Sequence, residues 1–223
     1  MKIISNTSGN HLVEIVRIAR ESDKLYIVSP FLMESFEMFF DAIDGSTVKE
    51  IALITMLKDN DPDLLHKANS FRSFLSLCQE RSLRCSLYID NILHGKAYLG
   101  EKNGVLVQGI LSSANFTHSG MNRNHEWGVL FDDEAMLRAL LQEVLSACSL
   151  PLPEATIKDI VNCIDAYTRT HSVLPKPTIK LPVSSLLALR DTVKLEPSVG
   201  TGKTQFAGLI LSRLLPDIQR AEY

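Results

Sequence analysis

The sequence has no hydrophobic run long enough to cross a membrane, because no stretch approaches the roughly 18 to 20 apolar residues that a spanning helix requires. Residues 1–6 also lack the extended apolar segment of a secretory signal peptide. Both absences predict a soluble protein that works inside the cell, in the cytoplasm.

Basic side chains are not in excess, since 23 Lys and Arg stand beside 26 Asp and Glu and give a formal net charge of -3. A nucleic acid would therefore bind at a local patch and not in a global positive field. Cysteines are few and form no C-x-x-C pair, which predicts reduced packing thiols and not a disulfide framework or a zinc site. The four are Cys78, Cys85, Cys148 and Cys163.

The N-terminal part of the chain instead shows short apolar runs that alternate with helical patterns. Strands are predicted at residues 25–28, 51–54 and 83–89, and helices at residues 12–20, 36–43 and 61–80. This β-α-β-α order predicts an α/β fold with a mixed, mainly parallel sheet flanked by helices on both faces.

Beyond His94 the pattern becomes that of short strands, at residues 96–99, 105–111 and 127–131, with Lys102-Asn103-Gly104 as a hairpin turn. An acidic cap then begins a helix over residues 132–148, and the prolines of segment 150–153 mark a boundary. The 223 residues thus divide into a main domain at 1–150 and a small helical extension at 151–223. Helices are predicted in the extension at residues 157–167, 184–190 and 206–215.

The triplet His94-Gly95-Lys96 combines two side chains suited to phosphodiester cleavage. This reaction requires a nucleophile, a proton for the departing oxygen, and cationic or hydrogen-bonding groups around the phosphoryl oxygens. In an extended strand His94 and Lys96 point to the same face, with Gly95 keeping the opposite face small. The triplet occurs once, whereas the chemistry normally uses two histidines, so the count favours a dimer.

Two further segments supply the remaining groups. Asn115 follows Ser112 and Ser113 where the chain leaves a strand, so its amide could hold a phosphoryl oxygen, and Ser113 could add a hydroxyl. Glu126, at the start of the next strand, is placed to accept the Nδ1 proton of a histidine and thereby present Nε2 for attack.

These segments, His94-Gly95-Lys96, Ser112-Ser113-Ala114-Asn115-Phe116-Thr117 and Asn124-His125-Glu126, resemble the H-x-K motif, the G-S-x-N turn and the following acidic residue of the phospholipase D superfamily. Residues 25–31 are similar to the first core strand of that family, and the resemblance extends over residues 1–150.

The resemblance implies a phospholipase D-like fold and a phosphohistidine intermediate on His94, with Lys96 and Asn115 gripping the phosphate. It implies neither a metal nor another cofactor. With one motif in the chain, the second histidine would be His94 of another subunit in a homodimer. Single-motif chains of this length are most similar to metal-independent nucleases and restriction-type endonucleases, which implies DNA as the substrate.

The chain departs from the family pattern at two positions near the site. Glu101 stands where the family often has Asp, and Ser112 replaces the first Gly of the G-S-x-N turn. Farther on, the segment Gly200-Thr201-Gly202-Lys203-Thr204 resembles a phosphate-binding loop. However, Pro197 occupies the place of its first Gly and no later strand could supply a magnesium ligand, so we interpret it as a degenerate, flexible loop or a remnant.

Other functions remain open at this stage. A lipid phosphodiesterase or transphosphatidylase would use the same residues but needs an apolar membrane-facing stretch, for which only residues 206–215 qualify. A non-catalytic nucleic-acid-binding module would keep the fold without turnover, and His94 alone could be a structural histidine. The extension could help dimerise, touch nucleic acid, or dock a helicase or a methylation subunit. The remaining histidines are interpreted as surface or packing residues: His11, His66, His118, His125 and His171.

Overall fold

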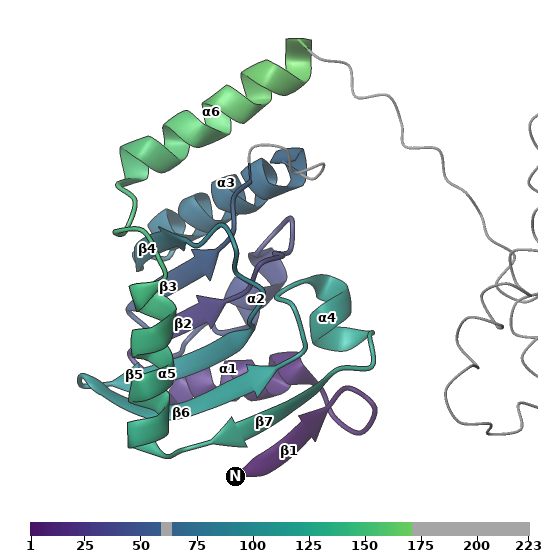
Figure 1. Cartoon of the computed structure of the whole chain (residues 1–223), viewed down its shortest axis with the longest axis vertical. Helices are drawn as coiled ribbons and strands as arrows, with labels where there is room; N and C mark the ends of the chain where they lie inside the picture. The colour runs from purple at the N-terminus through teal and green to yellow at the C-terminus, as the bar shows by residue number, and fades with distance from the viewer. Residues whose placement is uncertain (59–63, 171–223) are drawn as a thin grey trace, which may run out of the picture. The chain divides into compact units, whose positions relative to one another are not determined.

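The computed structural model describes residues 1–58 and 64–170, which form a seven-stranded sheet with strand order β1-β7-β6-β5-β2-β3-β4 (Figure 1). The strands are β1 (Lys2–Ser5), β2 (Lys24–Val28), β3 (Glu50–Thr55), β4 (Arg84–Ile89), β5 (Ala97–Lys102), β6 (Val105–Ser112) and β7 (Trp127–Phe131). The helices are α1 (His11–Glu21), α2 (Glu37–Ala42), α3 (Leu64–Glu80), α4 (His118–Asn122), α5 (Glu134–Ser146) and α6 (Glu154–Thr170). Within these described ranges no helix is long and apolar enough to span a membrane.

Strands β2, β3 and β4 form the parallel part of the sheet and follow the predicted α/β pattern. β3 lies between the other two and pairs in parallel with both, and α2 and α3 lie in the connections. The run from Ile51 to Ile54 is fully buried because helices cover both sides of this strand. The strands predicted at 25–28, 51–54 and 83–89 are confirmed.

The sheet as a whole is mostly antiparallel, so the prediction of a mainly parallel sheet is wrong. Four neighbouring pairs run antiparallel, namely β1 with β7, β7 with β6, β6 with β5, and β5 with β2. The predicted hairpin at Asn103 and Gly104, where both residues have positive φ and Lys102 pairs with Val105, accounts for the pair of β5 with β6. After this turn the chain continues in antiparallel strands with no helical crossover long enough for parallel pairing.

Helices flank both faces of the sheet, as predicted, but they do so unequally. Helices α1, α2 and α3 cover one face through side chains such as Ile15, Phe39 and Phe71. On the other face, α5 is the covering helix among residues 1–58 and 64–170, through Leu137 and Leu141. In Figure 1, α5 crosses the near side of the sheet on the left, while the right-hand parts of β6, β7 and β1 have no helix in front of them.

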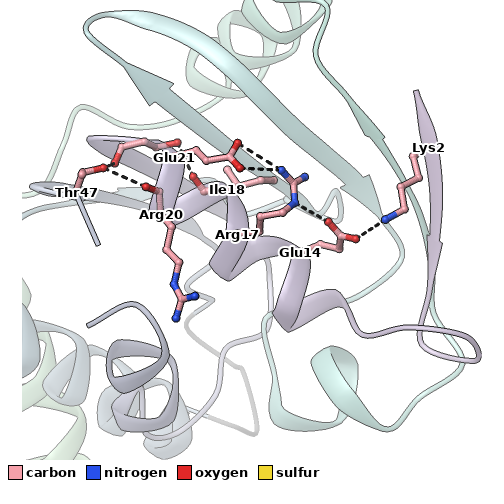
Figure 2. A network of polar contacts seen from close by, with 8 residues as sticks. Lys2, Glu14, Arg17, Ile18, Arg20, Glu21 and Thr47 are labelled. Atoms are coloured by element: carbon pink, nitrogen blue, oxygen red, sulfur yellow. Dashed lines mark hydrogen bonds and ion pairs between the residues drawn. The ribbon is translucent and has the colours of Figure 1, made fainter. Parts of the chain in front are cut away.

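Ion pairs join α1 to strand β1, which the sequence patterns did not predict (Figure 2). Lys2 Nζ lies 2.6 Å from Oε1 of Glu14, and Oε2 of the same carboxylate accepts from Arg17 Nε at 3.1 Å. Arg17 pairs in turn with Glu21, one helical turn farther on, at 3.3 Å. The hydrogen bond from Lys2 holds the pKa of Glu14 below its ordinary value.

Helix α6 packs against α3 in the same folded unit as the sheet. Ile157 and Val161 of α6 are buried in the core that also contains side chains of α3. Arg72 of α3 donates a hydrogen bond to Asp165 of α6 at 2.7 Å. The rest of the extension, including the helices predicted at 184–190 and 206–215 and the Gly200-Thr204 loop, lies outside the described residues.

The four cysteines are free thiols in the structure. Cys78 is buried at the end of α3, and Cys85 and Cys148 are partly buried. Cys163 is exposed on α6, so the expectation that all four pack in the interior is wrong for this residue.

Candidate active site

The five predicted site residues lie at one edge of the sheet. His94 and Lys96 precede β5, Ser113 and Asn115 follow β6, and Glu126 directly precedes β7. Because β6 runs antiparallel to both β5 and β7, the start of β5, the end of β6 and the start of β7 meet at the same edge. The fold therefore gathers residues that come from separate parts of the sequence.

His94 and Lys96 differ in their environments. His94 is exposed, whereas Lys96 is only 8% exposed, and neither side chain has a hydrogen bond or ion pair with another described residue. The backbone of Lys96 is fixed, since its carbonyl accepts from Ser112 N–H at 3.0 Å. A Cβ placed on Gly95 would meet no atom within 4 Å, so crowding does not explain the glycine between them.

Asn115 lies in a turn whose backbone is well fixed. Ala114 N–H donates to Ser112 Oγ at 2.9 Å, and Thr117 N–H donates to the carbonyl of Asn115 at 2.7 Å. In contrast, Oδ1 of the Asn115 side chain is buried and has no hydrogen-bond partner among the described residues. A buried amide oxygen without a partner is costly, and because it can only accept, it would be satisfied by a group that donates a hydrogen bond beside it.

Helix α4, which sequence patterns did not predict, closes on the backbone of Asn115. Thr117 caps this short helix by accepting from Gly120 N–H at 3.0 Å. A Cβ placed on Gly120 would lie 2.4 Å from the carbonyl oxygen of Asn115. Only glycine allows the helix and the turn to approach so closely.

Glu126 is held by neighbours in its own chain. One carboxylate oxygen accepts from Ser113 Oγ at 2.5 Å and the other from Asn124 Nδ2 at 3.3 Å. Ser113 also accepts from Trp127 N–H at 3.1 Å, so its hydroxyl links the turn after β6 to the start of β7. Among the described residues no histidine donates to Glu126, and the predicted contact with a histidine is therefore not formed within one chain.

A buried histidine that contacts Ser112 was not predicted from the sequence as part of the site. His11, at the start of α1, is fully buried, and its Nε2 lies 2.8 Å from Oγ of Ser112. Burial lowers the pKa of His11, while the negative charge of Glu126 raises it. The interpretation as a packing residue was correct about burial, but the sequence carried no signal that would link it to Ser112.

Tyr98 of β5 and Ser29, which follows β2, form hydrogen bonds with the backbone of the turn that contains Asn115. The hydroxyl of fully buried Tyr98 donates to the carbonyl of Ala114 at 2.7 Å, and burial holds its pKa well above the ordinary value. Ser29, at the end of β2, accepts from Phe116 N–H at 2.8 Å. Both contacts attach the segment around Asn115 to the central strands.

Metal ligands do not gather in the part of the chain that the structure describes. Residues 1–58 and 64–170 contain no group of three or more His, Cys, Asp or Glu side chains arranged to hold a metal ion.

Residues 10–153 match the protein family described as the NgoFVII restriction endonuclease N-terminal PLD domain. No curated protein matches the chain in sequence. The matched residues make up more than half of the chain and include every predicted site residue.

Several solved structures are similar in fold. Nuc, a phospholipase D family member from Salmonella typhimurium, is 11% identical with a TM-score of 0.48, and the match covers 69% of this chain and 97% of that chain. NucT from Helicobacter pylori is also 11% identical, with a TM-score of 0.44 over 68% of this chain and 100% of that chain. Polyphosphate kinase from Porphyromonas gingivalis is 14% identical, with a TM-score of 0.45 over 69% of this chain and 26% of that chain.

Proposed function

Because the chain belongs to the phospholipase D superfamily, in the family of the NgoFVII restriction endonuclease N-terminal PLD domain, we propose that it is an endonuclease that cleaves DNA phosphodiesters without a metal ion. The observation that carries the proposal is the meeting of His94, Lys96, Asn115 and Glu126 at one sheet edge within the matched domain. These groups supply a nucleophile, a cation, an amide and a carboxylate.

In the proposed reaction, His94 Nε2 attacks phosphorus and forms a phosphohistidine while the bond to one DNA oxygen breaks. A second histidine gives its proton to that oxygen, and then removes a proton from the water that hydrolyses the phosphohistidine. Lys96 and Asn115 hold the non-bridging oxygens. Lys96 has no side-chain partner among the described residues, which supports this assignment because its ammonium group is available to a ligand. Asn115 would donate to the phosphate from Nδ2, since its Oδ1 can only accept.

The second histidine is proposed to be His94 of another subunit, since the chain contains one H-x-K triplet. In a symmetric dimer the two His94 side chains are equivalent, so either one could attack phosphorus while the other protonates the leaving DNA oxygen. Glu126 of one subunit would then accept the Nδ1 proton of the other subunit's His94. This role is compatible with its contacts to Ser113 and Asn124, because a carboxylate has more than one acceptor site on each oxygen.

An uncovered apolar corner of the sheet supports a second copy as the partner. Ile3, Val129 and Leu111 stand side by side across β1, β7 and β6, and Trp127 lies two residues before Val129 on the same face. Ile3 is 77% exposed, Trp127 59% and Leu111 49%, because α5 crosses the other end of these strands (Figure 1).

This corner lies at the same sheet edge as Glu126 and has roughly 400 Å² of exposed apolar surface, as large as the largest patch on a typical monomer. A stable interface buries about 800 Å² on each partner, so the corner would supply about half of one side.

The test is nicking of supercoiled plasmid by the full chain in EDTA. Cleavage should persist in chelator and disappear in His94→Ala and Lys96→Ala. Protein that cleaves neither DNA nor RNA under these conditions would contradict the proposal and favour a binding module. Release of headgroups from phospholipid vesicles without DNA cleavage would instead establish the lipid phosphodiesterase.

Mixed dimers test the shared site. Equal amounts of wild-type and His94→Ala subunits, exchanged by mild denaturation, should retain about a quarter of the wild-type rate, because every mixed dimer lacks one histidine. Independent sites would retain about half. Sizing should give a dimer for the wild type and a shift towards monomer for Trp127→Ser, and a strictly monomeric active wild type would refute the composite site.

A further inference from the structure

His11 is a fully buried histidine that the proposed reaction does not use, yet its ring joins the N-terminal segment to the turn that carries Asn115. Nδ1 lies 2.6 Å from Oδ1 of Asn6, and Nε2 lies 2.8 Å from Oγ of Ser112. Ser112 and His11 are 101 positions apart in sequence, so this contact depends on the whole sheet.

The contacts of Asn6 decide which ring nitrogen of neutral His11 carries the hydrogen. Asn6 Nδ2 donates to the carbonyls of Gly120 at 2.8 Å and Asn124 at 3.0 Å. Its Oδ1 therefore faces His11, and because this oxygen can only accept, Nδ1 of the ring must be the donor. Nε2 of neutral His11 is then an acceptor that faces Ser112.

The hydroxyl of Ser112 has one hydrogen and two acceptors within reach, Nε2 of His11 at 2.8 Å and the carbonyl of Trp127 at 3.1 Å. With neutral His11 the hydroxyl donates to Nε2. With protonated His11 the ring donates to Oγ, and the hydroxyl hydrogen turns to Trp127. In both states Oγ accepts from Ala114 N–H, so His11 and Ser112 keep hydrogen-bond partners whichever state His11 adopts.

The charge that acts on His11 comes from the site itself. Among the described residues, Glu126 is the charged group whose field favours the protonated ring, and burial opposes it. The groups that contact the ring, Asn6 and Ser112, are neutral. A phosphate bound beside Asn115 would add negative charge on the same side as Glu126.

We propose that His11 is a positioning residue for phosphate binding. The hydrogen-bonded chain of Asn6, His11 and Ser112 fixes the turn that carries Asn115, and His11 takes a proton from solvent when a phosphate binds beside that turn. The inference rests on the proposed function in one respect, since it places the phosphate of the substrate next to Asn115.

The first test uses NMR of the imidazole nitrogens in the full-length wild type and requires no cleavage. The neutral ring of His11 should carry its hydrogen on Nδ1. Glu126→Gln should move its titration midpoint to lower pH, and inorganic phosphate should move the wild-type midpoint upwards. An Nε2–H tautomer, or a midpoint that neither change moves, would overturn the proposal.

The second test separates the two bonds of the ring. In His11→Asn the side-chain amide takes the place of Nδ1, and the hydrogen bond to Ser112 is lost. In His11→Gln the amide takes the place of Nε2, so the hydrogen bond to Ser112 is kept but the side chain no longer titrates. His11→Asn and Ser112→Ala should each lower kcat roughly five- to tenfold, and the double variant should be no worse than either. His11→Gln should keep most of the rate but lose the pH dependence that His11 contributes.

His66→Gln is the matched control, because it removes an imidazole from α3 and should leave rate and pH profile unchanged. Additive losses in the double variant would refute the coupling between His11 and Ser112. If the wild type cleaves no DNA but His11 shows the expected tautomer and phosphate response, the proposed function fails while the positioning role stands. If the variants do not fold, the NMR test on the wild type and Glu126→Gln still decides.

Discussion

The approach of Gly120 to Asn115 gives the most direct perturbation of the site that does not touch its chemical groups. In Gly120→Ala the new Cβ would begin 2.4 Å from the carbonyl oxygen of Asn115 and 3.1 Å from its nitrogen. Real Cβ contacts stay beyond 3.0 Å, so helix α4 and the turn must separate by at least the 0.6 Å between 2.4 and 3.0 Å. Both atoms belong to backbone and cannot rotate away.

Two magnitudes follow from this displacement. Overpacking of a tight contact costs about 1–3 kcal/mol, which lowers the melting temperature by roughly 2–12 °C in a protein of this size. A misplacement of about 1 Å can reduce a rate about 100-fold, so a shift of 0.6 Å should lower kcat of DNA cleavage by about tenfold or more.

The assay pairs thermal unfolding with plasmid nicking at a temperature where all proteins are folded. Gly95→Ala is the control for stability, because a Cβ at Gly95 meets no atom within 4 Å and should leave the melting temperature within about 2 °C. A Gly120→Ala protein as stable as the wild type would disprove the close approach. Normal kcat together with lowered stability would show that the position of Asn115 does not control the reaction.

Three further predictions concern stability. Tyr98→Phe leaves the buried carbonyl of Ala114 without a donor and should cost about 1–3 kcal/mol in urea unfolding, and an unchanged midpoint would contradict the contact. Lys67→Met removes the donor to Pro30 and Thr55 and should cost a similar amount by the same measurement. Since the pKa of Glu14 is lowered in the folded state, its contribution, below about 1 kcal/mol, should be present above the unfolded pKa of about 4.3 and be lost as pH falls through the native pKa. Glu14→Gln should therefore be less stable than the wild type at pH 7, with a difference that shrinks in acid, and a constant difference would refute this origin.

Local patterns predicted the parallel part of the fold because each of its elements has its own signal. The apolar run from Ile51 to Ile54 and the helical spacing of α3 are visible within a few residues. The hairpin at Asn103 and Gly104 was visible for the same reason. The antiparallel pairing of β5 with β2 was not, because strand partners far apart in sequence leave no local trace, and β1 is too short for a periodic signal.

The candidate site likewise has a part that was predictable from local sequence and a part that was not. Its five residues were predicted from short motifs and from the family that these motifs resemble, and the structure brings them to one edge. Their roles in the reaction remain predictions. The contacts that hold them were not predictable, because they depend on the folded arrangement of the chain. Glu126 accepts from Ser113 and Asn124, and Tyr98 of β5 donates to the carbonyl of Ala114.

Ser112 shows why a departure from a family pattern has to be judged in three dimensions. In sequence it is a serine where a glycine is usual, which suggests a small loss of backbone freedom. In the structure its hydroxyl accepts from Ala114 N–H and meets His11 Nε2, so it fixes the turn that a glycine would leave freer. The serine at position 112 therefore provides the hydrogen-bond partner that Nε2 of the buried His11 needs. Because the hydroxyl bonds a group that can change its protonation state, the serine also gives the turn a means of responding to charge at the site, which a glycine could not provide.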